Sequence, residues 1–166
     1  MKKIIFVFIV FISSYNYAQQ ELKLDIADAI ILKTIEFSYE NYITDQTSFG
    51  ASILYSFEEK KSDFRYNEQF MFTPYVRHYF TAYENWNLFG EGFLGISTGY
   101  KEIELDDAQN IYEDYSDGAL GIAFGTKYVA KGGLVIDIYG GLGRNLFSSN
   151  SPVIVPRIGV NVGWRF

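Results

Sequence analysis

The chain contains no cysteine, and this absence narrows its chemistry. It excludes disulfides and thiolate metal sites, and it removes the lipid-bearing cysteine that a bacterial lipoprotein needs after its signal. Histidine occurs once and proline three times in 166 residues. The formal net charge is −6. An acidic chain is a poor ligand for a polyanion, because binding phosphates requires clustered Lys and Arg. Nucleic acid is therefore excluded as a partner.

Long apolar runs are also scarce, and the clearest one lies at the start of the chain. Ile4 to Ile12 is about half the ~20 residues that a membrane-spanning helix needs. It follows a Lys pair and precedes a polar stretch that contains Ala18, which is typical of a secretory signal peptide. We predict a signal peptide over residues 1–18 and one mature domain over residues 19–166. A buried N-terminal strand is the alternative.

Aromatic residues, in contrast, are abundant at 19% of the chain, and they alternate with polar or small residues. The alternation is clearest in the last nine residues, where one face carries Ile158, Val160, Val162, Trp164 and Phe166. A strand that is apolar on one face and polar on the other, and that closes on a terminal Phe, is how outer-membrane barrels end. We predict that Phe166 is the signal read by the barrel-assembly machinery.

The same period of two recurs along the chain and predicts about eight strands. They lie near residues 22–26, 35–40, 49–57, 69–80, 86–97, 119–128, 134–143 and 154–166. The predicted fold is all-β, a closed eight-stranded antiparallel transmembrane barrel with an apolar outer face. Phe89 and Phe93 fall on the polar face of their strand. Either a β-bulge or a locally apolar interior would account for this. Inward glycines at 121, 125, 141, 143, 159 and 163 are expected to make room for large neighbours.

Connections between these strands alternate in length. Short turns are expected at 44–47, 82–85 and 130–133, and longer loops at 58–66, 101–115 and 147–152. Outer-membrane barrels place short turns in the periplasm and long loops outside. The segment 101–115 is acidic, so we expect a solvated external loop; binding of divalent cations, alone or bridged to lipopolysaccharide phosphates, is the alternative.

The polar faces of the strands carry charges of both signs. We predict an ionic network inside the barrel made of Glu36, Glu40, Arg77, Glu91, Lys127, Asp137, Arg157 and Arg165. Because eight strands enclose a lumen only just filled by side chains, the network is expected to form a packed plug. A narrow proton or ion path is the alternative. No metal-ligand cluster or cofactor motif is present in the sequence.

The single histidine, His78, is a candidate base because imidazole titrates near neutral pH. It shares the lipid-facing side of its strand with Phe80, and the serine that a lipid-facing deacylase carries two residues away is missing. We therefore predict no catalytic residue. A periplasmic aromatic girdle is predicted from Trp86, Tyr128, Trp164 and Phe166, and an external one from Tyr55, Phe57, Tyr100 and Phe147.

Four motifs, at 72–80, 89–93, 139–147 and 156–166, resemble a family of small outer-membrane β-barrel proteins of unknown function, of the eight-stranded OmpA and OmpX type. The resemblance covers nearly the whole mature chain. It implies an outer-membrane barrel of the Gram-negative cell envelope, and it brings no catalytic residues.

We expect a non-enzymatic structural or adhesive envelope component, or an accessory subunit of an outer-membrane complex. Expected partners are outer-membrane lipid, lipopolysaccharide and the barrel-assembly machinery, and an envelope protein is a further candidate partner. The alternatives are a small lipid-modifying enzyme, a narrow ion pore and a soluble lipocalin-like ligand-binding barrel.

Overall fold

The computed structural model describes residues 19–31, 34–57, 68–81, 85–104, 110–147 and 153–166. The predicted signal peptide lies outside these residues. The elements, in chain order, are β1 (Gln20–Asp25), α2 (Ile26–Ile31), β2 (Thr34–Thr44), β3 (Thr47–Ser56), β4 (Glu68–Tyr79), β5 (Trp86–Glu104), β6 (Asn110–Val129), β7 (Leu134–Asn145) and β8 (Ile154–Arg165). None of the described helices is long and apolar enough to cross a membrane.

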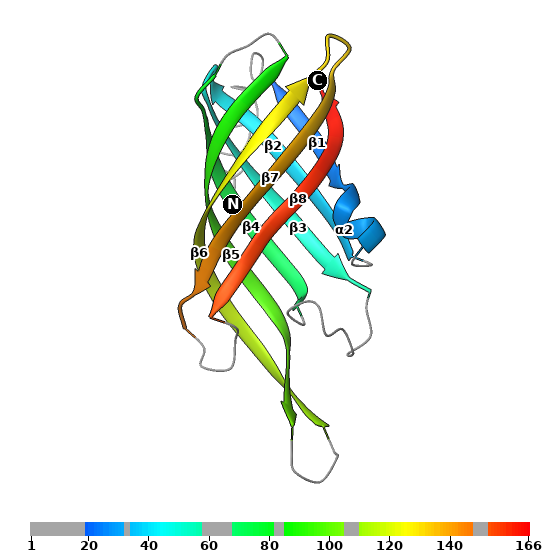
Figure 1. Cartoon of the computed structure of the whole chain (residues 1–166), viewed down its shortest axis with the longest axis vertical. Coiled ribbons are helices and arrows are strands. Elements are labelled where there is room, and N and C mark those ends of the chain that lie inside the picture. The colour runs from blue at the N-terminus through cyan, green and yellow to red at the C-terminus, as the bar shows by residue number, and fades with distance from the viewer. Residues whose placement is uncertain (1–18, 32–33, 58–67, 82–84, 105–109, 148–152) are drawn as a thin grey trace, which may run out of the picture.

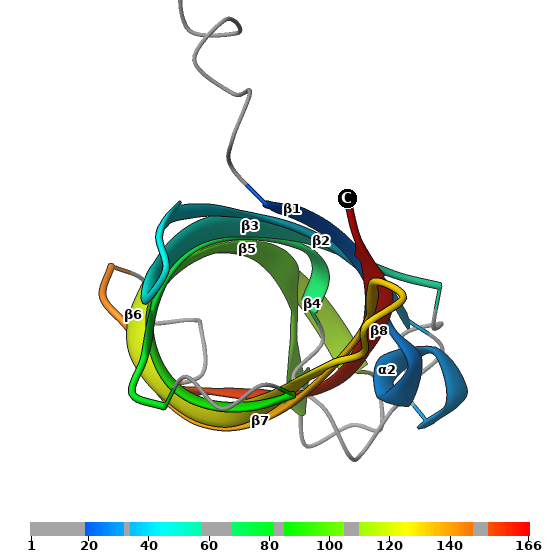
Figure 2. The same ribbon diagram turned by 90° about the horizontal axis from the view of Figure 1, so that it is seen from above.

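The eight strands form a closed antiparallel barrel in sequence order (Figures 1 and 2). Closure is made by β1 pairing with β8, and backbone hydrogen bonds join Gln20 and Phe166 in both directions, at 3.1 and 2.9 Å. A closed sheet leaves no strand edge with unpaired backbone groups, which a membrane interior requires. The predicted fold class is confirmed.

The barrel is apolar outside and polar inside. On β6, Leu120, Ile122 and Phe124 expose 55 to 61% of their surface, while Ala119 and Ala123, which face the other way, are buried. The same alternation holds for the apolar faces predicted on the other strands. A water-soluble fold buries its large apolar side chains, so this arrangement is the reverse of a soluble core.

Phe89 and Phe93 point into the barrel and are almost completely buried. The pairing of β5 with β6 is continuous past both residues, so the interior is locally apolar and the bulge is excluded. Gly125 and Gly121 stand opposite them, and a Cβ at Gly121 would lie 2.3 Å from the Phe93 ring. The predicted use of inward glycines is therefore confirmed here.

Two parts of the chain differ from the prediction. The first is α2, which follows β1 directly and lies outside the barrel wall near β8 (Figure 2). Its sequence, Ile-Ala-Asp-Ala-Ile-Ile, contains two alanines, the best helix former, and Asp25 before it is a preferred N-cap type. These local preferences end the strand alternation at Asp25.

The second difference is the segment 101–115, where the prediction of a loop is wrong for most of the backbone. Strand pairing between β5 and β6 continues to Glu104 and Asn110, so the two strands form a hairpin that projects beyond the other strands (Figure 1). Ile103 and Ile111 pair directly across the hairpin, and Tyr100 lies in the same extension; aromatic and β-branched residues of this kind favour strands.

Candidate functional site

The most concentrated polar chemistry lies inside the barrel, around Glu40 on β2. Its carboxylate accepts hydrogen bonds from Arg77 on β4 and Lys127 on β6, both at 3.0 Å, and from Lys23 on β1. All four side chains are buried. One carboxylate therefore ties together three cations from three different strands.

A second carboxylate, Asp137 on β7, faces the same cations. It accepts a hydrogen bond from Lys23 at 2.7 Å and from Arg77 at 2.6 Å, and Lys127 lies 3.9 Å away. Because each cation contacts both carboxylates, the centre of the barrel is a shared charge cluster and not a set of separate pairs.

The cluster continues toward the end of the barrel that carries the long connections. Glu91 on β5 accepts from Arg77 and from Arg157 on β8, both at 2.7 Å. Arg157 also lies 3.4 Å from Glu36 on β2. Two arginines are thus held by carboxylates contributed by neighbouring and opposite strands.

Toward the short turns the network ends at Glu21 on β1. Glu21 accepts from Lys127 at 2.6 Å and from Arg165 on β8 at 2.9 Å. The hydroxyl of Tyr42 accepts from the same two cations, at 3.1 and 2.9 Å. Arg165 is the most exposed member, with 21% of its side chain accessible.

Aromatic rings fill the space beside the cations. The Arg77 guanidinium lies 4.2 Å from the centre of the Phe89 ring and 4.7 Å from that of Tyr75. Arg157 lies 5.2 Å from the Tyr139 ring centre. Within about 6 Å such cation–ring contacts are favourable, so the rings both pack the lumen and stabilise the buried charge.

The structure brings all eight residues of the predicted interior network into connected ion pairs. It adds Glu21 and Lys23, which the sequence analysis missed. Their signal was present, because Glu21, Lys23 and Asp25 alternate with Leu22 and Leu24. The ten connected groups are five cations and five carboxylates, so their charges balance.

Metal binding finds no support in the described part of the chain, where no group of three or more His, Cys, Asp or Glu side chains is arranged to hold an ion. In the acidic segment 101–115, side chains are described only from Asp114 onward, and Asp114 is exposed. The divalent-cation site considered as the alternative for that segment therefore lies mostly outside the described side chains.

The single histidine faces outward. His78 is exposed, its Nδ1 lies 3.4 Å from the Thr47 hydroxyl, and its ring packs edge-on against Phe80 at 5.4 Å. Among the described residues no carboxylate hydrogen-bonds the imidazole. A hydroxyl and an imidazole meet here without the orienting acid that activated nucleophiles commonly use.

The four residues predicted for the aromatic girdle lie at one end of the barrel. Trp86 and Tyr128 are paired on β5 and β6 with ring centres 5.0 Å apart, and Trp164 stands beside the β6–β7 turn, next to Gly133. Phe166 is 68% exposed. Gly133 has a positive φ of 94°, which allows this tight turn. The role of Phe166 in assembly stays a prediction.

Neither the known protein-family models nor the curated protein sequences include a match to this chain. Solved structures do match. Neisserial surface protein A is 10% identical with a TM-score of 0.55, over 90% of this chain and 94% of that chain. The N-terminal β-barrel domain of OprF from Pseudomonas aeruginosa is 12% identical with a TM-score of 0.53, over 90% and 96%. Ail, the attachment invasion locus protein of Yersinia pestis, is 14% identical with a TM-score of 0.52, over 90% and 93%.

The fold is that of the small outer-membrane barrels. Identities this low establish the architecture and nothing finer. An outer-membrane-type barrel of eight strands has a lumen just wide enough for side chains. In this protein the lumen contains the charge cluster described above, whose charges are buried and mutually paired.

Proposed function

We propose that this protein is an integral outer-membrane protein, exported with residues 1–18 as its signal peptide, and that its barrel has a structural, non-enzymatic role. The observation that carries the proposal is the apolar exterior around a charged, internally paired interior. Exposed apolar surface on this scale marks contact with lipid or protein. Buried charges are tolerated because each has partners.

The orientation follows from the turns and the girdle. The short turns lie at the end that carries Trp86, Trp164 and Phe166, and barrels of this class place short turns in the periplasm. The long connections and the β5–β6 hairpin then face outward from the cell. Tyr55 and Phe57, with ring centres 5.1 Å apart, belong to the external girdle.

Cell fractionation combined with gel mobility tests this proposal. We expect the protein in the outer-membrane fraction, with a folded form that migrates differently before and after boiling. A mature chain that stays dissolved without detergent would favour the soluble ligand-binding barrel. In planar bilayers we expect no steady conductance, because the paired cluster occupies the lumen; conductance steps that change when Arg77 or Glu91 is neutralised would favour the pore.

An adhesive role is supported by the hairpin. Beyond the pair Gly99–Tyr115, β5 and β6 continue to Glu104–Asn110, and within the described part of the chain they pair there only with each other. Five further residues at about 3.4 Å each project the hairpin about 17 Å beyond the wall. One structural neighbour is an attachment protein by its name, which is compatible with the proposed use of such a projection.

Replacing residues 100–114 by a short turn tests this second role. The barrel keeps its paired cluster and is expected to fold with unchanged heat-modifiable mobility. Cells that produce the truncated form should adhere to host cells less well than cells that produce the whole protein. Equal adherence would leave the barrel with a structural role alone, and copurification from native membranes would then be used to identify a complex of which it is an accessory subunit.

A further inference from the structure

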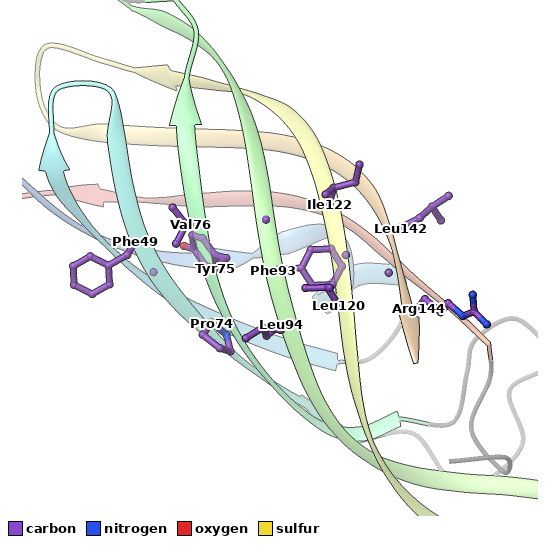
Figure 3. A pocket seen from close by; sticks show the side chains of 14 residues that line it. Phe49, Pro74, Tyr75, Val76, Phe93, Leu94, Leu120, Ile122, Leu142 and Arg144 are labelled. Carbon is purple, nitrogen blue, oxygen red and sulfur yellow. The ribbon is translucent and has the colours of Figure 1, made fainter. Parts of the chain in front are cut away.

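The outer wall of the barrel is hollowed across β3 to β7 (Figure 3). The hollow has a volume of about 980 Å³ and is mostly apolar. One side is a row of outward residues that pair with one another from strand to strand: Phe49, Val76, Gly92, Ile122 and Leu142. The other side includes Pro74, Leu94, Leu120 and Arg144.

The depth of this groove comes from glycine. The floor is the inward row between the two sides, made of Gly50, Tyr75, Phe93, Gly121 and Gly143. On the outer side Gly92 interrupts a row of large side chains, and a Cβ at Gly92 would meet no atom within 4 Å. The groove is therefore open at its middle and walled by exposed apolar side chains.

One charged residue lines the groove, and it lies at one end. Arg144 is the last but one residue of β7, at the end of the barrel with the long connections, and its neighbours on adjacent strands are Leu120 and Ile154. It is exposed and forms no ion pair with the described residues. An arginine among lipid-facing apolar side chains at the end of a membrane strand reaches toward the headgroup layer.

The length of the groove suits a lipid chain. It crosses from β3 to β7, four strand spacings of about 4.8 Å, or about 19 Å in all. It runs from Phe49, near the start of β3, to Arg144, near the end of β7. The hydrocarbon of one leaflet is about 15 Å deep. An acyl chain lying obliquely in the groove would thus reach the headgroup layer at Arg144.

We propose that this groove, the Gly92 groove, binds one phosphate-bearing lipid of the outer leaflet, with an acyl chain along the apolar walls and the phosphate on Arg144. The inference rests on the proposed membrane location. Guanidinium groups bind phosphate through two parallel hydrogen bonds, which gives the site its charge complementarity. A second copy fits less well, because a two-fold axis along the membrane normal would place two Arg144 side chains at the same depth.

Two variants test the phosphate-binding end and the apolar part of the site independently. Arg144→Gln removes the charge, and Lys131→Gln is its control, since Lys131 is an exposed cation in the short turn at the opposite end. Gly92→Leu fills the groove. Gly140→Leu is the matched control, because Gly140 also faces outward, has nothing within 4 Å of a Cβ and does not line the groove.

Native mass spectrometry of the delipidated, detergent-solubilised protein provides the readout. The probes are dimyristoyl phosphatidic acid, dimyristoylglycerol with the same chains, and inorganic phosphate. Arg144→Gln should lower the affinity for phosphatidic acid about tenfold, the size expected for losing hydrogen bonds to a charged group. It should leave the affinity for dimyristoylglycerol unchanged. Gly92→Leu should weaken both lipids, and the two controls should bind like the unaltered protein.

Equal lipid retention by all variants would overturn the proposal that the groove binds lipid. Displacement of the lipid by inorganic phosphate alone would also overturn it. A dimer that forms when lipid is removed and that Gly92→Leu abolishes would assign the groove to a second copy. Fractionation is scored separately. A protein that enters membranes but shows no variant effect refutes only this site, whereas a protein that never enters membranes refutes the proposed function.

Discussion

Neutralising Glu40 is the sharpest perturbation of the charged interior. Glu40→Gln keeps the volume and one acceptor oxygen, so the packing of the lumen is preserved. It removes the negative charge shared by Lys23, Arg77 and Lys127, all of which are buried. Among the described ion pairs the connected network then holds five cations and four carboxylates, so its cations exceed its carboxylates by one.

The expected loss follows from this arrangement. Breaking a buried ion pair by removing one partner costs about 3–5 kcal/mol, because the other charge stays buried. Glu36→Gln is the matched control on the same strand and the same inward face. Among the described residues Glu36 forms an ion pair with Arg157, at 3.4 Å, and Arg157 keeps Glu91 at 2.7 Å, so we expect a loss of about 1 kcal/mol.

Urea titration of protein refolded in phospholipid vesicles measures both losses, with the fluorescence of Trp86 and Trp164 as the signal. Unfolding and refolding curves must coincide for the free energies to be compared. If the free energy of unfolding of the Glu40→Gln variant lies within about 1 kcal/mol of that of the unaltered protein, the interior is not a tightly coupled charge cluster. Equal losses for both variants would show that position in the network does not matter.

Three further predictions concern the wall. Gly121→Leu should abolish the heat-modifiable folded band, because a Cβ there lies 2.3 Å from the Phe93 ring; a normal band would show that the lumen can repack. Ile138→Arg, near the middle of β7 on the outer face, should cost about 2–4 kcal/mol in vesicles, measured by urea titration, and an unchanged stability would argue against a lipid-facing position. The fluorescence of Trp86 and Trp164 should be quenched by lipids brominated near the headgroup more than by lipids brominated at the chain ends, and the reverse order would remove both residues from the girdle.

Strand parity could be predicted from sequence because the barrel wall imposes a strict period of two. Phe70, Val76 and Phe80 face outward and Arg77 faces inward, as their alternation indicates. The pairing partners of an inward charge could not be predicted, because they depend on strand tilt and register. Glu40 and Asp137 are 97 positions apart and still share Arg77.

Local preferences explain the errors. The helix α2 was missed because its six residues are too few for a helical pattern to stand out beside the strand alternation. The β5–β6 extension was missed because acidic residues such as Glu102 and Asp114 suggested a loop, although a two-stranded ribbon in water carries charges without difficulty. The Gly92 groove was invisible in sequence, since it arises only when five strands are placed in register.

The measurement that bears most directly on the inside-out arrangement uses the absence of cysteine. Single cysteines placed along β6 from Ala119 to Phe124 can each carry a spin label in vesicles, and collisions with oxygen and with a water-soluble nickel complex can be compared. We expect strong oxygen contact with a period of two, high at Leu120, Ile122 and Phe124 and low at Ala119 and Ala123. Strong contact with the nickel complex at Leu120 and Ile122 would show that this face meets water, and the account would be wrong.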